Sequence, residues 1–433
     1  MLATRRVLSV GIVTAALWAC SATTQAQPID AQDALERAQA AEADGRHRDA
    51  FEAYLQAWED PALREEAARR ARTLERIARF QGQDDLRAIE PLQERLGPGF
   101  ATYRSRSFLV LSDAGDTWTR ARITLLERAR EQYFRDLDRL GVPVHPHLHR
   151  LVCVFFGEHG DYLDFAQRHD GFNAGWTAGY YSMAHNAIII HDDRTSPSLA
   201  RVMRELEGHQ TRIDELNERA RQADRARQPR QAKLLRDAAA DLEANLAEEH
   251  QRIERQVLRF GVAKVLHEAV HLLAFNTGLQ DRNVAYPLWV SEGIAASFET
   301  DNTSGRFGFA FAYEPRRRQL DEIVLGGDLP GLTDLLTLDD NTNLDANSAR
   351  PLYAAAYGLF EELHRTQRNQ LAGYLRELAD LPPGEQSDAD HIARFERHFG
   401  DVAALERRLM RRWSAAARER KDETDAGWRA AGL

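Results

Sequence analysis

Two histidines, His267 and His271, stand four residues apart, with Glu268 directly after the first. Residues 262–275 have helical character, which we expect to end with Gly278 as the C-cap. Side chains four apart share one helix face, so both imidazoles can reach one Zn²⁺ ion. A metal held in this way lowers the pKa of a bound water, and Glu268 can take its proton. The pattern predicts a hydrolytic metal site if a third ligand exists.

Glu292 is the candidate for that third ligand. It follows His271 by 21 residues, within a second helical segment over 287–299 that can fold back onto the first. Three protein ligands leave one position of a tetrahedral zinc site open, as catalysis requires. The residues admit two other interpretations: the histidines make only ordinary hydrogen bonds, or the metal is structural. A structural site, however, has no use for Glu268 between its ligands.

The two motifs together resemble those of the gluzincin metallopeptidases. In that family a glutamate ligand follows the H-E-x-x-H helix at about this distance. The run from Trp289 to Glu299, W-x-x-E-G-x-A-x-x-x-E, is similar to that of aminopeptidase-type gluzincins and of peptidase MA-like bacterial proteins. The resemblance covers roughly residues 100–410. It implies three zinc ligands and one general base, namely His267, His271 and Glu292 with Glu268 as the base.

The resemblance also implies roles around the metal. The segment 353–360 resembles a tyrosine-bearing helix of peptidase MA-like proteins, and a phenol there would donate a hydrogen bond to the developing oxyanion. We favour Tyr353 over Tyr357 for this catalytic role, with a place in the core as the alternative for either. Glu299, seven residues after Glu292, is expected either to orient a metal ligand or to be a surface or capping carboxylate.

In gluzincins the edge strand of a small sheet receives the extended substrate, and the resemblance assigns that strand to Ala187–His191. Two features depart from the family pattern. The stretch 181–186 lacks the carboxylate that holds the free amine in aminopeptidase-type gluzincins, so we expect an endopeptidase. Ala296 stands where thermolysin-like enzymes have an aspartate, which leaves the hydrogen-bond partner of the first histidine unassigned.

The elements that position these residues predict a helix-rich α+β fold. Short apolar strands near 108–111 and 151–156 flank an amphipathic helix over 117–140 that ends at Gly141. Two further strands, near 179–181 and 187–190, are expected to pair as a hairpin. We expect six segments along the chain: a signal peptide over 1–26, a tetratricopeptide-like (TPR-like) helical segment over 27–98, an α/β subdomain over 99–195, a coiled-coil hairpin over 196–260, the zinc-binding helix with a helical lower subdomain over 261–420, and a tail over 421–433.

Two of these segments admit a partner. Residues 31–80 resemble one TPR helix pair, which serves either as a peptide-docking module or as a helical cap on the next domain. On both sides of Pro229, apolar residues recur every three or four positions, which predicts two long antiparallel helices with Pro229 near the tip. That hairpin is either a partner-binding arm or a self-paired insertion.

Composition and the N-terminus restrict the class of protein. The chain of 433 residues has 67 acidic and 57 basic side chains and a net charge of −10, which argues against a nucleic-acid partner. Residues 1–26 have the order of a secretory signal peptide, so we expect an exported protein, periplasmic or secreted, without a transmembrane span after cleavage. A rival interpretation makes Cys20 a lipidated cysteine. Cys153 is expected to be buried in a strand.

Two further clusters receive ordinary interpretations. His145, His147 and His149 alternate between prolines, and a solvent-exposed loop is favoured there over a metal-binding tract. The three arginines over 316–318 are expected in an exposed loop, with recognition of an acidic group as the alternative.

Taken together, these patterns predict an exported zinc metallopeptidase that cleaves peptide or protein substrates. The alternative is a cell-envelope scaffold, in which the TPR-like and coiled-coil parts bind partners and the metallopeptidase domain is inactive or structural.

Overall fold

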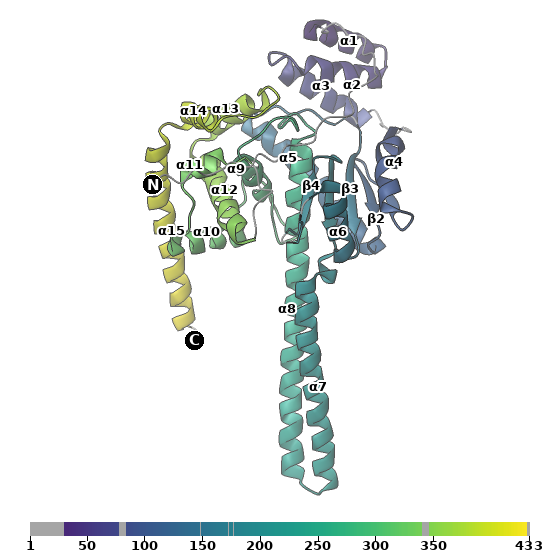
Figure 1. Ribbon diagram of the computed structural model, residues 1–433, viewed down its shortest axis with the longest axis vertical. Coiled ribbons are helices and arrows are strands. Elements are labelled where there is room, and N and C mark those ends of the chain that lie inside the picture. Colours follow the sequence, from purple (N-terminus) through teal and green to yellow (C-terminus); the bar gives the residue numbers. More distant parts are fainter. Residues whose placement is uncertain are drawn as a thin grey trace, which may run out of the picture.

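A computed structural model of the chain describes residues 30–77, 84–147, 149–171, 173–175, 177–339 and 346–430. The signal peptide expected over 1–26 and Cys20 lie outside these residues. Within them the fold is helix-rich α+β, as predicted, with one open five-stranded sheet (Figure 1). No helix in the described ranges is both long enough and apolar enough to cross a membrane.

The sheet has the strand order β1-β2-β3-β5-β4. Strands β2, β3 and β5 are parallel, whereas β1 and β4 run antiparallel to their neighbours. The expected hairpin of β4 and β5 is confirmed. The strands are β1 (Ala101–Arg104), β2 (Phe108–Ser112), β3 (Leu151–Phe156), β4 (Gly179–Ser182) and β5 (Ala187–His191).

The assignment of the edge strand to Ala187–His191 is wrong. That segment is β5, which pairs with β3 on one side and β4 on the other, so β4 is the edge strand beside the metal-motif helix. The physical reason lies in burial: every residue of β5 is buried, as in strands covered on both faces and both sides.

Helices cover both faces of the sheet. Alternate side chains such as Val110 and Phe155 pack with α5 (Asp116–Leu140) and α8 (Pro229–Ala274) in one core. The intervening side chains, Leu111 and Val154 among them, pack with α4 (Asp84–Leu96) and α6 (His159–Phe165) in a second core.

The predicted helix over 117–140 is confirmed and ends at Gly141 in a left-handed conformation. Cys153 is buried in β3, as expected. Two irregular turns complete this part, a π-helical turn over Ala166–Asp170 and a 3₁₀ turn over Asp193–Thr195.

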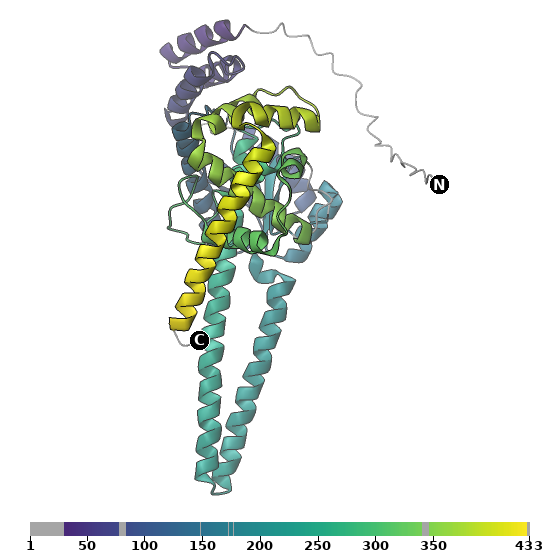
Figure 2. The ribbon, with the colours of Figure 1, turned by 90° about the vertical axis from the view of Figure 1, so that its left-hand side faces the viewer.

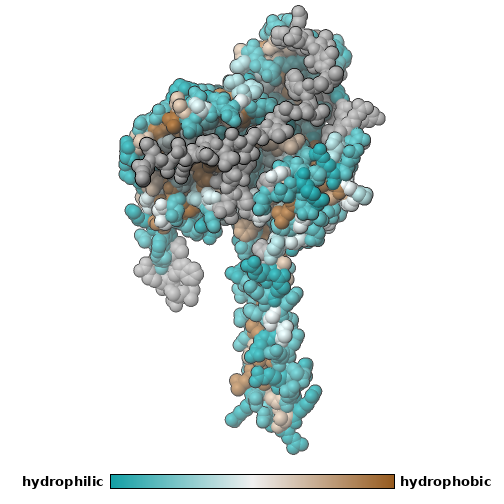
Figure 3. All heavy atoms as spheres, in the orientation of Figure 1, coloured by the Kyte–Doolittle hydropathy of each residue, from teal (hydrophilic) through white to brown (hydrophobic). Residues whose placement is uncertain are grey.

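A long helical hairpin projects from this body (Figures 1 and 2). It consists of α7 (Pro197–Arg225) and the first part of α8, with Pro229 as the first residue of α8. The two helices share buried seam residues, namely Leu206, Ile213, Ala239 and Leu246. The surface of this arm is mainly hydrophilic on the face shown in Figure 3.

Helix α8 does not stop at residue 260, where we expected the hairpin to end. It runs without a break from Pro229 to Ala274, a length of 46 residues. The second helix of the arm and the helix of the metal motif are therefore one continuous helix. Gly278 is not the C-cap, because the cap is Phe275. The glycine has φ +79° four residues after the helix, where a Cβ would lie 2.9 Å from the Trp58 ring.

That contact belongs to the docking of the N-terminal helices on the body. Helices α1 (Ala31–Ala43), α2 (His47–Ala57) and α3 (Arg64–Ile77) share their own core, while α4 packs on the sheet instead. His147 lies at the junction, where Arg130 donates to its Nε2 over 3.1 Å and also pairs with Glu75 of α3. The prediction of a solvent-exposed loop is therefore wrong for His147. Its side chain is 8% exposed, because the Arg130–Glu75 ion pair covers it.

The C-terminal half of the described chain is helical. Helix α9 (Leu288–Ala296) packs mainly on α12 and α8. The arginines over 316–318 lie in helix α10 (Glu314–Gly326), so the prediction that they belong to an exposed loop is wrong. The remaining helices are α11 (Leu332–Thr337), α12 (Ala346–Thr366), α13 (Arg368–Ala379), α14 (Asp388–Phe399) and α15 (Val402–Ala430), the last of which runs on past residue 420.

Candidate metal centre

Helices α8 and α9 bring the three expected ligands together. Nε2 of His271 lies 3.1 Å from Nε2 of His267, as the spacing of one helical turn predicts. The carboxylate of Glu292 on α9 approaches both imidazoles, with distances of 3.0 Å to His267 and 3.7 Å to His271. All three side chains are buried, and their ligand atoms lie within 4.8 Å of one another. This group could hold a metal ion.

A glycine allows α9 to deliver its glutamate. A Cβ on Gly293 would lie 2.8 Å from Cβ of Phe360 and 2.9 Å from the carbonyl oxygen of Ala356, both in α12. Real Cβ atoms do not approach so closely, so only glycine lets α9 rest against the α12 backbone. Gly293 therefore allows the close packing of α9 on α12, and this packing sets the position from which Glu292 reaches the histidines.

The hydrogen bonds fit a cation between these atoms. Nδ1 of His267 lies 2.9 Å from Oε1 of Glu299, so the neutral imidazole donates there and keeps a lone pair on Nε2. That lone pair faces Oε2 of Glu292, a buried oxygen without a hydrogen bond in the described chain. Two lone pairs directed at each other repel unless a proton or a metal ion lies between them. The donor set thus fits a metal held by two imidazoles and one carboxylate.

The electrostatics of the metal-free site point the same way. Burial opposes the charged form of His267, but Glu292 and Glu299 outweigh it and raise the pKa of His267 to about 10. The pKa of Glu292 is lowered, because the charges of both histidines outweigh its own burial. Without a metal, a proton on the imidazole takes the place of the cation.

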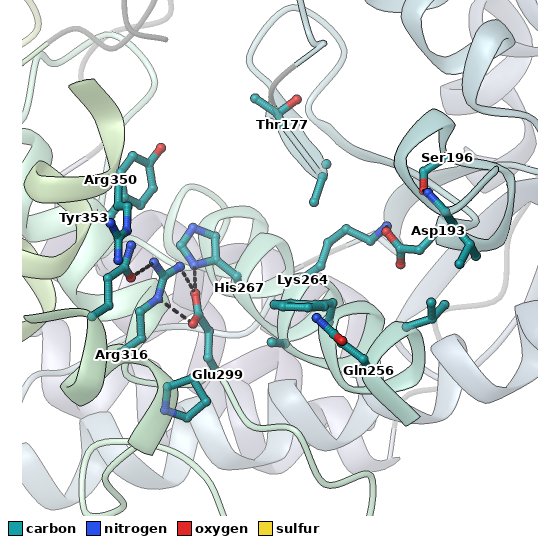
Figure 4. A pocket seen from close by; sticks show the side chains of 18 of the residues that line it. Thr177, Asp193, Ser196, Gln256, Lys264, His267, Glu299, Arg316, Arg350 and Tyr353 are labelled. Atoms are coloured by element: carbon teal, nitrogen blue, oxygen red, sulfur yellow. Dashed lines mark hydrogen bonds and ion pairs between the residues drawn. The ribbon is translucent and has the colours of Figure 1, made fainter. Parts of the chain in front are cut away.

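Glu299 and Arg316 form a second layer behind the ligands. Glu299 is 6% exposed, so of the two roles considered for it the structure favours the one that orients a ligand. Arg316 of α10 donates to both oxygens of this carboxylate over 2.7 and 2.6 Å (Figure 4). Sequence reasoning named Arg316 only as part of an exposed loop or as a group that recognises an acidic substrate, and it missed the contact with Glu299. No spacing rule could have found that contact, because α10 reaches Glu299 only through the tertiary fold.

Glu268 follows His267 on α8, and both residues line one large cavity. Glu268 is buried, and burial raises its pKa, although the two histidines act against this shift. The cavity places Glu268 beside the ligand group without making it a member of that group. A carboxylate in this place can accept a proton, which is the role expected of a general base.

The structure separates the two candidate tyrosines. Tyr353 lines the cavity, and its ring lies 6.3 Å from the His267 ring between centroids. Tyr357 is 1% exposed, and its hydroxyl accepts a hydrogen bond from the backbone N–H of Tyr313 over 3.1 Å. The two are one helical turn apart on α12, and of them it is Tyr353 that faces the site.

The cavity has a volume of about 1110 Å³ and lies between the base of the arm, β4 and β5 on one side and α10 and α12 on the other. Figure 4 shows its two poles: His267, Glu299, Arg316 and Tyr353 gather at one, and Lys264 extends toward Asp193 at the other. This volume exceeds that of most small-molecule pockets.

Comparison with known proteins gives one match. Residues 261–385 match a family described as "Protein of unknown function (DUF1570)", and this segment includes the three candidate ligands, Glu268, Glu299, Arg316 and Tyr353. Neither the curated proteins nor the solved structures include a significant match to the chain.

Proposed function

We propose that the protein is an exported, zinc-dependent hydrolase of the gluzincin type that cleaves internal peptide bonds. The observation that carries the proposal is the position of Glu268. This carboxylate lies in the cavity next to two imidazoles and a third ligand, while Glu299 occupies the far nitrogen of His267. A site that only stabilised the fold would need no proton acceptor facing an open cavity.

In this proposal His267, His271 and Glu292 hold the zinc ion. A bound Zn²⁺ would supply Lewis acidity, which polarises the substrate carbonyl and lowers the pKa of a water. Glu299 keeps the proton of His267 on Nδ1, so Nε2 is free to bind the metal. Burial would raise the pKa of the Glu299 carboxyl, but the charge and hydrogen bonds of Arg316, together with the contact to His267, lower it and keep Glu299 ionised.

Glu268 and Tyr353 carry the proton and charge transfers. Glu268 accepts a proton from the attacking water and returns it to the nitrogen of the departing amine. The Tyr353 hydroxyl donates a hydrogen bond to the oxygen that becomes negative as the carbonyl carbon turns tetrahedral.

Zinc content and hydrolysis should be measured on the same protein, expressed from residue 27 onward. We expect about one zinc ion per chain in the wild type and loss of zinc in Glu292→Ala. Glu268→Gln should retain zinc and lose cleavage of a peptide library. Full activity of Glu268→Gln on a substrate of the wild type would refute the proposal.

The scaffold alternative is favoured by a single observation, the projection of the arm far beyond the body that contains the site (Figure 1). It predicts a stable partner that remains bound when His267 and His271 are replaced, and that is lost when residues 205–250 are removed.

A further inference from the structure

The residues of α8 that line the cavity form one continuous stripe. Its large apolar side chains are Ile253, Val257 and Phe260, and the spacing of three or four residues continues through Lys264 to His267. This spacing keeps one face of a helix toward the cavity for about four turns. Ile253 also packs against the seam of the arm. The face that joins the two arm helices is therefore the face that carries the metal motif.

At its base the seam opens into the cavity. Farther out, Leu206 and Ile213 of α7 are buried against α8, with exposed fractions of 5% and 0%. Nearer the body, Leu199 and Val202 of α7 are only half-buried and line the cavity. Phe260 on the facing helix is 60% exposed. In the view of Figure 2, the ribbons of α7 and α8 are farther apart at the body than near the tip.

We propose that this open seam binds an extended polypeptide substrate and holds one of its bulky apolar side chains between Val202, Val257 and Phe260. The inference rests on the proposed function, because it extends the substrate site of the same enzyme. Phe260 precedes Glu268 by eight residues, or about 12 Å along the helix at 1.5 Å per residue. An extended chain advances about 3.3 Å per residue. The preferred apolar residue therefore lies about three or four positions from the scissile bond.

Polar groups between the two ends favour a peptide over a hydrocarbon chain. Nζ of Lys264 donates to the His191 carbonyl over 2.7 Å and to Oδ1 of Asp193 over 2.8 Å, which uses two of its three protons. All three residues line the cavity. The third proton of Lys264 can be donated to a peptide carbonyl, and the side chains of Thr177 and Gln256, which are at least partly exposed in the cavity wall, can pair with a peptide backbone. An acyl chain would only remove water from these groups.

A binding experiment tests this groove without requiring turnover. The full mature chain with Glu268→Gln is immobilised and exposed to a proteome-derived library of peptides of about ten to twenty residues, and the retained peptides are sequenced. We expect enrichment of peptides with bulky apolar residues. Adding Phe260→Ala should reduce their retention by roughly tenfold, since a large apolar contact is lost.

The matched control is Leu258→Ala on the same helix. Leu258 is 48% exposed and is not part of the cavity wall, so its removal should leave retention unchanged. Retention without an apolar preference, or a preference that survives Phe260→Ala, would overturn the inference.

The wild-type enzyme with the same library separates this inference from the proposed function. Cleavage sites with an apolar residue about three or four positions away support both. Cleavage without that preference refutes the groove alone. Apolar peptides that are retained through Phe260 but never cut would refute the hydrolase and leave the groove as a binding site.

Discussion

Glu299 and Glu292 approach His267 at its two nitrogens, Glu299 at Nδ1 over 2.9 Å and Glu292 at Nε2 over 3.0 Å. Glu299 thereby sets the tautomer of the imidazole, and Glu292 lies against Nε2, the nitrogen that would bind the metal. The imidazole is fixed before any metal arrives, which lowers the cost of organising the site.

Removal of the carboxylate behind His267 should weaken metal binding. We expect Glu299→Ala to lower zinc affinity by about 10- to 100-fold, because Nδ1 loses its acceptor and the ring its orientation. Competition with a chromophoric chelator measures this change. Glu361→Ala is the matched control, since Glu361 of α12 pairs with Arg317, the neighbour of Arg316 in α10, and has no hydrogen bond or ion pair with a candidate ligand in the described chain. Equal affinities for the two variants would contradict the role assigned to Glu299.

The metal-free protein should lose stability at alkaline pH. The pKa of His267 is raised from 6.5 to about 10 in the folded state. A raised pKa means that protonation stabilises the fold, fully below pH 6.5 and progressively less as the pH rises through 10. Urea unfolding of the metal-free protein should therefore give a lower free energy of unfolding at pH 9.5 than at pH 6.5.

His267→Gln should lose this component of the pH dependence, because the titrating group is gone. The zinc-loaded wild type should lack it as well, since the metal replaces the proton. An equal loss of stability in metal-free wild type and His267→Gln would assign the effect to other groups.

A methyl group at Gly293 should disturb the support of Glu292. Gly293→Ala places a Cβ 2.8 Å from Cβ of Phe360, so α9 must move away from α12 at a cost of about 1–3 kcal/mol. Thermal unfolding and zinc content should both fall. Gly160→Ala in α6 is the control, because its Cβ would meet no atom within 4 Å and a helical alanine is favourable by about 0.5–1 kcal/mol. Similar losses in both variants would count against the packing argument.

Shortening the arm should spare the metal site. When a short turn replaces residues 205–250, the base of the hairpin and the whole metal motif remain, so we expect about one zinc ion per chain and unchanged peptide cleavage. Elemental analysis and the library assay check this expectation. A folded, shortened protein without zinc would show that the distal arm supports the metal centre.

Much of the architecture follows from local patterns. The spacing of His267 and His271 and the seam residues of the arm depend on the helical period of 3.6 residues, and the central strands are short apolar runs within one segment. Such local patterns predicted the helix over 117–140, the β4–β5 hairpin and the long helical arm. They could not show that the arm and the metal motif share one helix, because a continuous helix and two shorter ones have the same period.

Tertiary contacts decided the rest. The amino-acid sequence by itself determined which residues could bind a metal, because ligand types and helical spacing are local properties. Only the fold decided that Arg316 supports Glu299, that β4 rather than β5 is the edge strand, and that His147 is buried. Each of these features depends on which surfaces come into contact in the folded chain. Burial and ion pairing between segments far apart in the sequence produce no periodic pattern of residues.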